Sequence, residues 1–207
     1  GGYTFTKLTS GNRYACGTAT NNNTYCWGDN SSGQLGNTTN SGTTNANNSP
    51  LLVQGGRTFT TITGAESNVC GIATNNNTYC WGLNLYGQLG NTTNSGTATA
   101  NNNPLLVQGG HNFVTISTTH YSTCAVASTS YTYCWGSNAL GQLGNTINSG
   151  TNTPNNTPLL INTPAINAST ATTVTLPTIT PPVHIAALRF ADENTNITRD
   201  YNYQNAT

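Results

Sequence analysis

Six cysteines are the residues of this chain whose type and spacing most clearly predict chemistry. They fall into three pairs whose members stand ten positions apart: Cys16 with Cys26, Cys70 with Cys80 and Cys124 with Cys134. Between the partners lie Thr, Tyr and Val residues around an Asn-rich turn, and Asn tolerates left-handed backbone geometry, so each segment predicts a β-hairpin. Two Cys that face each other across a hairpin come within disulfide range. Closing so short a loop would stabilise the fold by about 2.5–3 kcal/mol per bridge in the chain-entropy model.

Two other roles are open to these cysteines: free thiols buried in the core, or zinc ligands. A zinc site is disfavoured because the partners are not closely spaced and no His accompanies each pair. Disulfides form and persist in an oxidising compartment. We therefore favour three local disulfides and expect an extracellular or cell-surface protein.

The cysteine pairs belong to a unit that recurs three times at an interval of 54 residues. Such a period is typical of repeat proteins, in which each unit buries its apolar face against its neighbours. The expected units are 1–54, 55–108 and 109–162, and a non-repeating tail spans 163–207. The recurring positions include Phe5, Phe59 and Phe113; Trp27, Trp81 and Trp135; Gly-Gln-Leu-Gly segments that open at Gly33, Gly87 and Gly141; and Pro-Leu-Leu segments that open at Pro50, Pro104 and Pro158.

Each unit has the residue pattern of β-structure throughout. It opens with a Thr-rich apolar strand such as Thr58 to Thr63, continues through the Cys hairpin and the Gly-Gln-Leu-Gly turn, and closes on a short Pro-Leu-Leu strand. β-Branched and aromatic residues dominate the strands, and turn residues punctuate them. The polar stretch before the last strand, for example 37–49, is too hydrophilic for a core. We expect an exposed loop that either solvates the unit or forms a recognition surface.

The tail differs from the repeats, and its segment from Val183 to Phe190 is the most apolar run of the chain. We predict a strand there. Two roles are open to it: covering the exposed end of the repeats, or pairing with another subunit by strand addition. The chain opens with Gly-Gly-Tyr and no signal peptide. We expect either a processed N-terminus or a portion of a longer protein.

The spaced residues of the repeat resemble the regulator of chromosome condensation repeat. The second unit has the fullest match, at Phe59, Ile62, Gly64, Cys70, Tyr79, Trp81, Gly82, Asn84, Gly87, Gln88, Leu89, Gly90 and Pro104, and the third adds His120. The resemblance implies four-stranded antiparallel blades arranged as a β-propeller, and the Cys pairs point to the secreted, disulfide-containing bacterial-type branch. The expected fold is all-β, with three propeller-blade repeats and a C-terminal strand-rich tail. Propellers of the family typically have seven blades, so three blades imply a longer protein, a ring completed by several chains, or an open assembly.

The charge of the chain excludes several functions. Only 5% of the residues are charged, and five basic residues balance five acidic ones. Without a basic patch we expect no nucleic-acid partner, and no stretch is apolar enough to predict a membrane span.

The titratable residues of the repeats give no pattern of catalysis. The charged ones are Lys7, Arg13, Asp29, Arg57 and Glu66, and none recurs at its equivalent positions. We therefore predict no enzyme activity, no metal and no cofactor. The recurring Trp could stack on a carbohydrate, but regular recurrence favours packing between blades.

Asn-x-Ser/Thr sequons predict sugar attachment at Asn22, Asn30, Asn37, Asn47, Asn76, Asn91 and Asn155. Their number is close to chance in so Asn- and Thr-rich a chain, so the prediction depends on exposure of the loops.

Together these features predict a non-enzymatic extracellular structural or adhesive surface protein, a subunit of a homopolymeric fibre or larger assembly. The alternative is a propeller binding module that grips a protein or glycan partner through its rim loops.

Overall fold

The computed structural model describes residues 2–162, 188–191 and 198–201, and all the regular elements in these ranges are β-strands. Twelve strands form three four-stranded antiparallel sheets, which confirms the all-β fold with one sheet per repeat. The first sheet comprises β1 (Phe5–Ser10), β2 (Tyr14–Ala19), β3 (Thr24–Gly28) and β4 (Asn47–Leu52). The second comprises β5 (Phe59–Gly64), β6 (Asn68–Ala73), β7 (Thr78–Gly82) and β8 (Asn101–Leu106). The third comprises β9 (Phe113–Thr118), β10 (Ser122–Ala127), β11 (Thr132–Gly136) and β12 (Asn155–Leu160).

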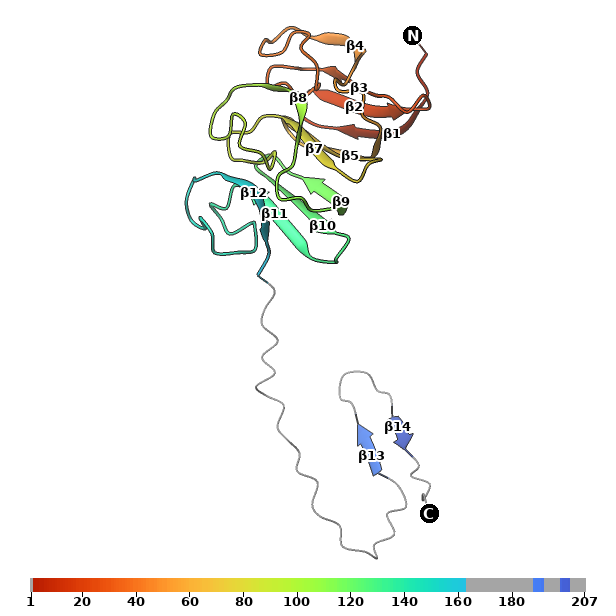
Figure 1. The fold of residues 1–207 in the computed structure, drawn as a ribbon, viewed down its shortest axis with the longest axis vertical. Coiled ribbons are helices and arrows are strands. Elements are labelled where there is room, and N and C mark those ends of the chain that lie inside the picture. Colours follow the sequence, from red (N-terminus) through yellow and green to blue (C-terminus); the bar gives the residue numbers. More distant parts are fainter. Residues whose placement is uncertain (1, 163–187, 192–197, 202–207) are drawn as a thin grey trace, which may run out of the picture. The chain divides into compact units, whose positions relative to one another are not determined.

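The three sheets lie side by side in chain order, and we call residues 2–162 the repeat body (Figure 1). Each sheet is a meander, with its strands hydrogen-bonded in sequence order. The first strands β1, β5 and β9 contact one another in series, so they form the inner edge of the body. The last strands β4, β8 and β12 form its outer edge.

The register of the hairpins explains the cysteine spacing. Cys16 pairs directly with Cys26 across β2 and β3, and a disulfide joins them with α-carbons 4.0 Å apart. The Cys70–Cys80 and Cys124–Cys134 disulfides repeat this geometry, each with α-carbons 4.1 Å apart. The turn that sets the register needs a left-handed residue, which is Asn22 in the first hairpin, with φ 66°.

The outermost strands begin earlier than the sequence predicts. β4 starts at Asn47, inside the stretch expected to be an exposed loop, because Asn47 is buried and its side-chain amide donates to the carbonyl of Gly28. These strands also carry a proline, such as Pro50, which removes a backbone donor from the open edge. The Asn37 amide occupies an acceptor of the same strand by donating to the Leu52 carbonyl at 2.9 Å. Both features limit pairing of this edge with other strands.

The tail forms a separate unit, residues 165–207. In its described part β13 (Leu188–Ala191) pairs antiparallel with β14 (Thr198–Tyr201). The end of the apolar run predicted as a strand therefore is a strand, whereas residues 183–187 lie outside the described residues. Its role as a cap or as a strand for another subunit stays a prediction.

Candidate functional site: the two end faces of the repeat body

Neighbouring sheets are joined by a buried tryptophan that reaches across to the preceding sheet. The Nε1 of Trp81 donates to the carbonyl of Gln34, and that of Trp135 to the carbonyl of Gln88, both at 3.0 Å. Both indoles are fully buried. A buried indole N–H requires an acceptor, and these carbonyls supply it.

The acceptor loop is held in shape by a buried asparagine. Asn30 donates through Nδ2 to the carbonyls of Asn37 and Thr39, at 2.8 and 2.7 Å, and its Oδ1 accepts from the Leu35 N–H at 3.0 Å. Asn84 and Asn138 make the same bonds in the other sheets. The recurrence of this Asn at the repeat interval was the signal available in the sequence for a structural role.

The glycines of the Gly-Gln-Leu-Gly loop allow the next sheet to approach. A Cβ on Gly33, where φ is +81°, would lie 2.7 Å from the Asn101 carbonyl carbon, and one on Gly36 would lie 3.0 Å from Trp81 Nε1. The second loop meets the third sheet in the same way. In the third loop a Cβ on Gly141 would meet nothing closer than 3.9 Å. The third loop thus has the same glycine, although no residue of a further sheet is described beside it.

The apolar core lies between the sheets. Leu35 and Val53 of the first sheet pack with Phe59, Val69 and Trp81 of the second. The second and third sheets repeat the arrangement, so each sheet offers one face to the sheet before it and the other to the sheet after it.

The first sheet therefore has one face without a described neighbour, which we call the N-terminal face and define by Phe5, Ala15 and Trp27. All three are partly exposed, whereas their equivalents in the second sheet, Phe59, Val69 and Trp81, are at most 1% exposed. Within residues 2–162 no hydrogen bond to Trp27 Nε1 is present. The expectation that the Trp pack between blades is confirmed for Trp81 and Trp135 and stays a prediction for Trp27, whose face has no neighbour among the described residues.

The third sheet has the complementary face, which also has no neighbour among residues 2–162. We call it the C-terminal face and define it by Cys124, Val126, Leu140, Gln142 and Ile161. Gln142 is exposed, whereas Gln34 and Gln88 are 0% exposed, and Leu140 is 93% exposed. The residue equivalent to Leu140 in the second sheet is Tyr86, which packs on Tyr121 of the third sheet with ring centroids 4.8 Å apart. Leu140 thus occupies a contact position that has no described partner.

Comparisons with known proteins agree with this architecture. The model of the regulator of chromosome condensation (RCC1) repeat matches residues 21–72 and 75–126, together half of the chain. The chain belongs to the RCC1-repeat family. Each matched range begins in the turn of one Cys hairpin and ends in the next hairpin. The boundaries of the family repeat therefore differ from those of the four-stranded sheets. The three disulfides support the disulfide-containing branch of the family.

Solved structures of propeller proteins share the fold of this RCC1-repeat chain. Yeast RCC1 (Prp20) bound to Kap60 superposes with a TM-score of 0.67 at 17% identity, covering 78% of this chain and 38% of that one. A second structure, of Saccharomyces cerevisiae Prp20p, is described with its binding to Gsp1p and histones. It superposes with a TM-score of 0.67 at 17% identity, covering 78% of this chain and 39% of that one. Human WBSCR16 superposes with a TM-score of 0.63 at 18% identity, covering 76% of this chain and 37% of that one. The chain thus spans less than two fifths of these structures. No curated protein sequence matches it.

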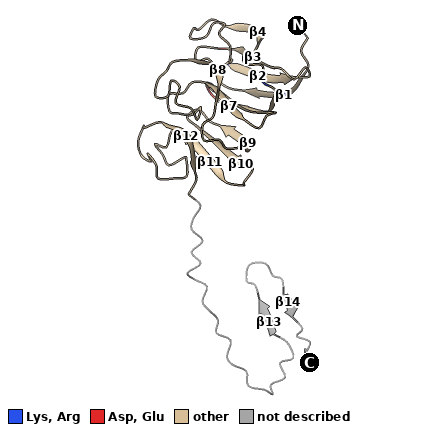
Figure 2. Cartoon of the chain, in the orientation of Figure 1, with Lys and Arg blue, Asp and Glu red and all other residues tan. Residues whose placement is uncertain are grey.

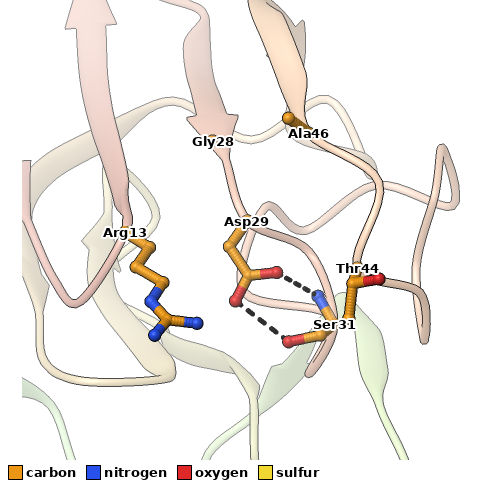
Figure 3. Close-up of a pocket in the computed structure, with 6 residues that line it drawn as sticks. All are labelled: Arg13, Gly28, Asp29, Ser31, Thr44 and Ala46. Carbon is orange, nitrogen blue, oxygen red and sulfur yellow. Dashed lines mark hydrogen bonds between the residues drawn. The ribbon is translucent and has the colours of Figure 1, made fainter.

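The RCC1-repeat body has one hollow that carries both signs of charge. A cavity of about 260 Å³ is lined by Arg13, Gly28, Asp29, Ser31, Thr44 and Ala46. Figure 3 shows these six residues, with the Asp29 carboxylate directed at Ser31. The Asp29 carboxylate accepts from the Ser31 N–H and hydroxyl, at 3.0 and 2.9 Å, and from Gln34 Nε2 at 2.9 Å. With these bonds made, Asp29 is held in place as a structural acceptor. The hollow can bind polar groups, and its lining pairs the Ser31 hydroxyl with the Asp29 carboxylate but includes no His.

Other polar groups of the repeat body also join sheets. Tyr14 shares its single hydroxyl proton between the carbonyls of Ala65 and Asn68, at 2.9 and 2.8 Å, and burial raises the pKa of this hydroxyl. His120 contacts the Glu66 carboxylate and stacks on Tyr121. Among the described residues no group of three or more His, Cys, Asp or Glu is placed to hold a metal ion. The same residues include no helix long and apolar enough to cross a bilayer.

Three of the seven predicted sugar acceptors are buried: Asn30, Asn47 and Asn155. Their amides bond to the protein backbone, so a transferase cannot reach them in the folded state. Sugar at these positions is therefore incompatible with the fold. The remaining four stay predictions: Asn22 and Asn76, which are exposed, and Asn37 and Asn91, which are partly buried.

Proposed function

We propose that this chain is a non-enzymatic extracellular structural or adhesive protein that acts as a subunit of a homopolymeric fibre or larger assembly. The observation that carries the proposal is the pair of end faces that have no neighbour among residues 2–162. Each is one half of the sheet-to-sheet contact that occurs twice inside the repeat body. A surface of this kind is suited to contact with a further sheet.

The disulfides support an extracellular location. One disulfide crosslinks two strands in each of the three sheets, and no Cys is left free. Such bonds persist outside the reducing cytosol. They stabilise sheets whose apolar cores are small.

The surface supports a structural or adhesive role. Figure 2 shows a ribbon that is almost wholly neutral over the described residues. The loops between the third and fourth strands of each sheet are held by hydrogen bonds of their own side-chain amides, as the bond from Asn40 Nδ2 to Asn47 Oδ1 at 3.0 Å illustrates. Hydroxyl- and amide-rich loops of fixed shape keep the surface hydrated without charge repulsion between subunits.

Electron microscopy and light scattering of the native protein test the proposal. We expect regular filaments or rings, with a mass that is a multiple of the monomer and rises with concentration. A monodisperse monomer at every concentration and in native material would contradict it.

A second candidate is a binding module, which the hollow between Arg13 and Asp29 favours. A guanidinium opposite a fixed carboxylate, with Ser31 and Thr44 beside them, suits a polar partner such as a glycan or a peptide carboxylate. Saturable binding that Arg13→Ala abolishes, in a protein that stays monomeric, would favour this function over the assembly.

A further inference from the structure

The contact between sheets follows a rule that can be stated in three parts. The Trp of one sheet donates to the Gln carbonyl of the sheet before it, as Trp81 does to Gln34. The loop glycine lies against the first residue of the outermost strand of the next sheet, as Gly33 lies against Asn101. The residue before that glycine faces the loop between the first two strands of the next sheet.

The third part is clearest between the second and third sheets. Tyr86 packs there on Tyr121, and the Gln88 side chain donates to the His120 carbonyl at 3.2 Å. The 54-residue interval places Arg13 where the third sheet has Tyr121. Leu140 occupies the position of Tyr86.

Both halves of this contact are present in one chain, and neither has a neighbour among residues 2–162. The C-terminal face has the acceptor carbonyl at Gln142, the open space over Gly141 and the exposed Leu140. The N-terminal face has a partly exposed Trp27. Within residues 2–162, the Trp27 donor at one end has no acceptor and the Gln142 carbonyl at the other end has no indole donor.

We propose that the N-terminal face of a second copy of this chain docks on the C-terminal face, and this inference rests on the proposed function. Trp27 Nε1 donates to the Gln142 carbonyl, the strand that begins at Asn47 lies over Gly141, and Leu140 packs on the aliphatic stem of Arg13. The occupant is a second copy because the docked sheet continues an interface that the chain already makes twice with these residue types. Such a contact joins unlike faces, so it leaves a free face at each end and propagates into a ring or a filament.

Two variants of the full chain separate the faces. Trp27→Arg blocks the N-terminal face and Leu140→Arg blocks the C-terminal face, whereas Tyr131→Arg, at a hairpin-turn position 58% exposed and outside both faces, is the matched control. Sedimentation velocity measures assembly, and mass spectrometry of alkylated protein checks that the disulfides remain. We expect each face variant to weaken association about tenfold or more and the control to assemble as the wild type does.

Mixing the two face variants tests the polarity of the contact. Each retains the face that the other lacks, so the equimolar mixture should form a dimer and nothing larger. If the wild type assembles but the face variants assemble equally well, or their mixture stays monomeric, the contact is wrong while the proposed function stands. A wild-type chain that never assembles overturns both.

Discussion

At the scale of single residues, identical side chains acquire different roles from their neighbours. Trp81 and Trp135 are buried donors between sheets, whereas Trp27 has the same sequence context and is partly exposed. The same holds for Gln34 and Gln142, one fully buried and the other exposed. The free energy contributed by a repeated residue therefore depends on whether a further sheet follows.

Substitution of the tryptophans makes this difference measurable. Trp81→Phe leaves the buried Gln34 carbonyl without a donor and creates a small void, so we expect a loss of about 2–3 kcal/mol in the free energy of unfolding. Trp27→Phe is the matched control, and in the monomer we expect a change below about 0.5 kcal/mol. Chemical denaturation of monomeric protein measures both. Equal losses would show that the hydrogen bond across the sheets contributes little.

Tyr14 adds a pH dependence at the junction of the first two sheets. Burial raises the pKa of its hydroxyl in the folded state above the value in the unfolded chain, about 10. The folded state thus holds this proton more tightly, and the stability that it contributes is present below pH 10 and is lost as the pH rises above it.

The comparison with Tyr14→Phe isolates that contribution. The variant lacks the hydrogen bonds to Ala65 and Asn68 and should be less stable at pH 8 by about 1–2 kcal/mol. The difference should shrink between pH 10 and 11 in denaturation measurements. The pKa of Tyr79 is lowered by its hydrogen bond to Arg57. Tyr79 is present in both proteins, so its contribution to the pH dependence of stability cancels in the comparison. A difference that stays constant with pH would contradict the account.

At the scale of elements, the sequence predicts the hairpins well and the loops poorly. Paired Cys on facing strands and an Asn-rich turn define a local register, so Cys16 meets Cys26 as expected. The polar loops were predicted to be exposed because they lack apolar residues. Asn47, inside the stretch 37–49, is instead buried, since its amide donates to the Gly28 carbonyl, which would otherwise be unpaired there. Side-chain polarity alone does not reveal such internal bonding.

The end faces could not be recognised from the repeat pattern either. The pattern identifies which residues form a contact between sheets, such as Trp27 and Gln142. The repeat pattern does not show which of these residues contacts a neighbouring sheet, because that depends on how the sheets are arranged in space. The family resemblance predicted the blades, and the structure added which blade surfaces have no neighbour among residues 2–162.

The disulfides should differ in reactivity according to the face on which they lie. Cys16, Cys26, Cys70 and Cys80 are 0% exposed, whereas Cys124 is partly exposed on the C-terminal face. In monomeric protein a small thiol should therefore reduce the Cys124–Cys134 bond first, since a thiolate must reach a sulfur atom to attack it. Differential alkylation followed by mass spectrometry gives the order. Simultaneous reduction of all three would indicate global unfolding instead.

At the scale of the whole molecule, the repeat body is an arrangement of charge-poor sheets with two unlike ends. Its formal net charge is +1, from Lys7, Arg13 and Arg57 against Asp29 and Glu66, and of the residues that define the end faces none is charged. Only Arg13 adds a charge at the edge of the proposed contact. Association between such faces is driven by burial of apolar surface and by a few buried hydrogen bonds, rather than by attraction between charges.

This origin of the driving force predicts how assembly responds to salt. Mobile ions screen interactions between charges, and the screening length falls from about 10 Å at 0.1 M to about 3 Å at 1 M salt. A contact held by ion pairs would weaken over this range. The contact through Trp27, Leu140 and Gln142 contains no ion pair, so we expect the concentration needed for assembly to change by less than about twofold between 0.1 and 1 M sodium chloride. Sulfate, which is excluded from protein surfaces, should lower that concentration.

Light scattering at a series of protein concentrations measures this quantity, and Leu140→Arg supplies the control because it introduces a charge at the contact. A tenfold or larger increase in the concentration that the wild type needs in 1 M sodium chloride would mean that charged residues elsewhere, such as those of the tail, hold the subunits together. The end faces would then be surfaces for another partner. If apolar, uncharged faces hold the subunits together, the protein concentration needed for assembly should be insensitive to sodium chloride and should be lowered by sulfate.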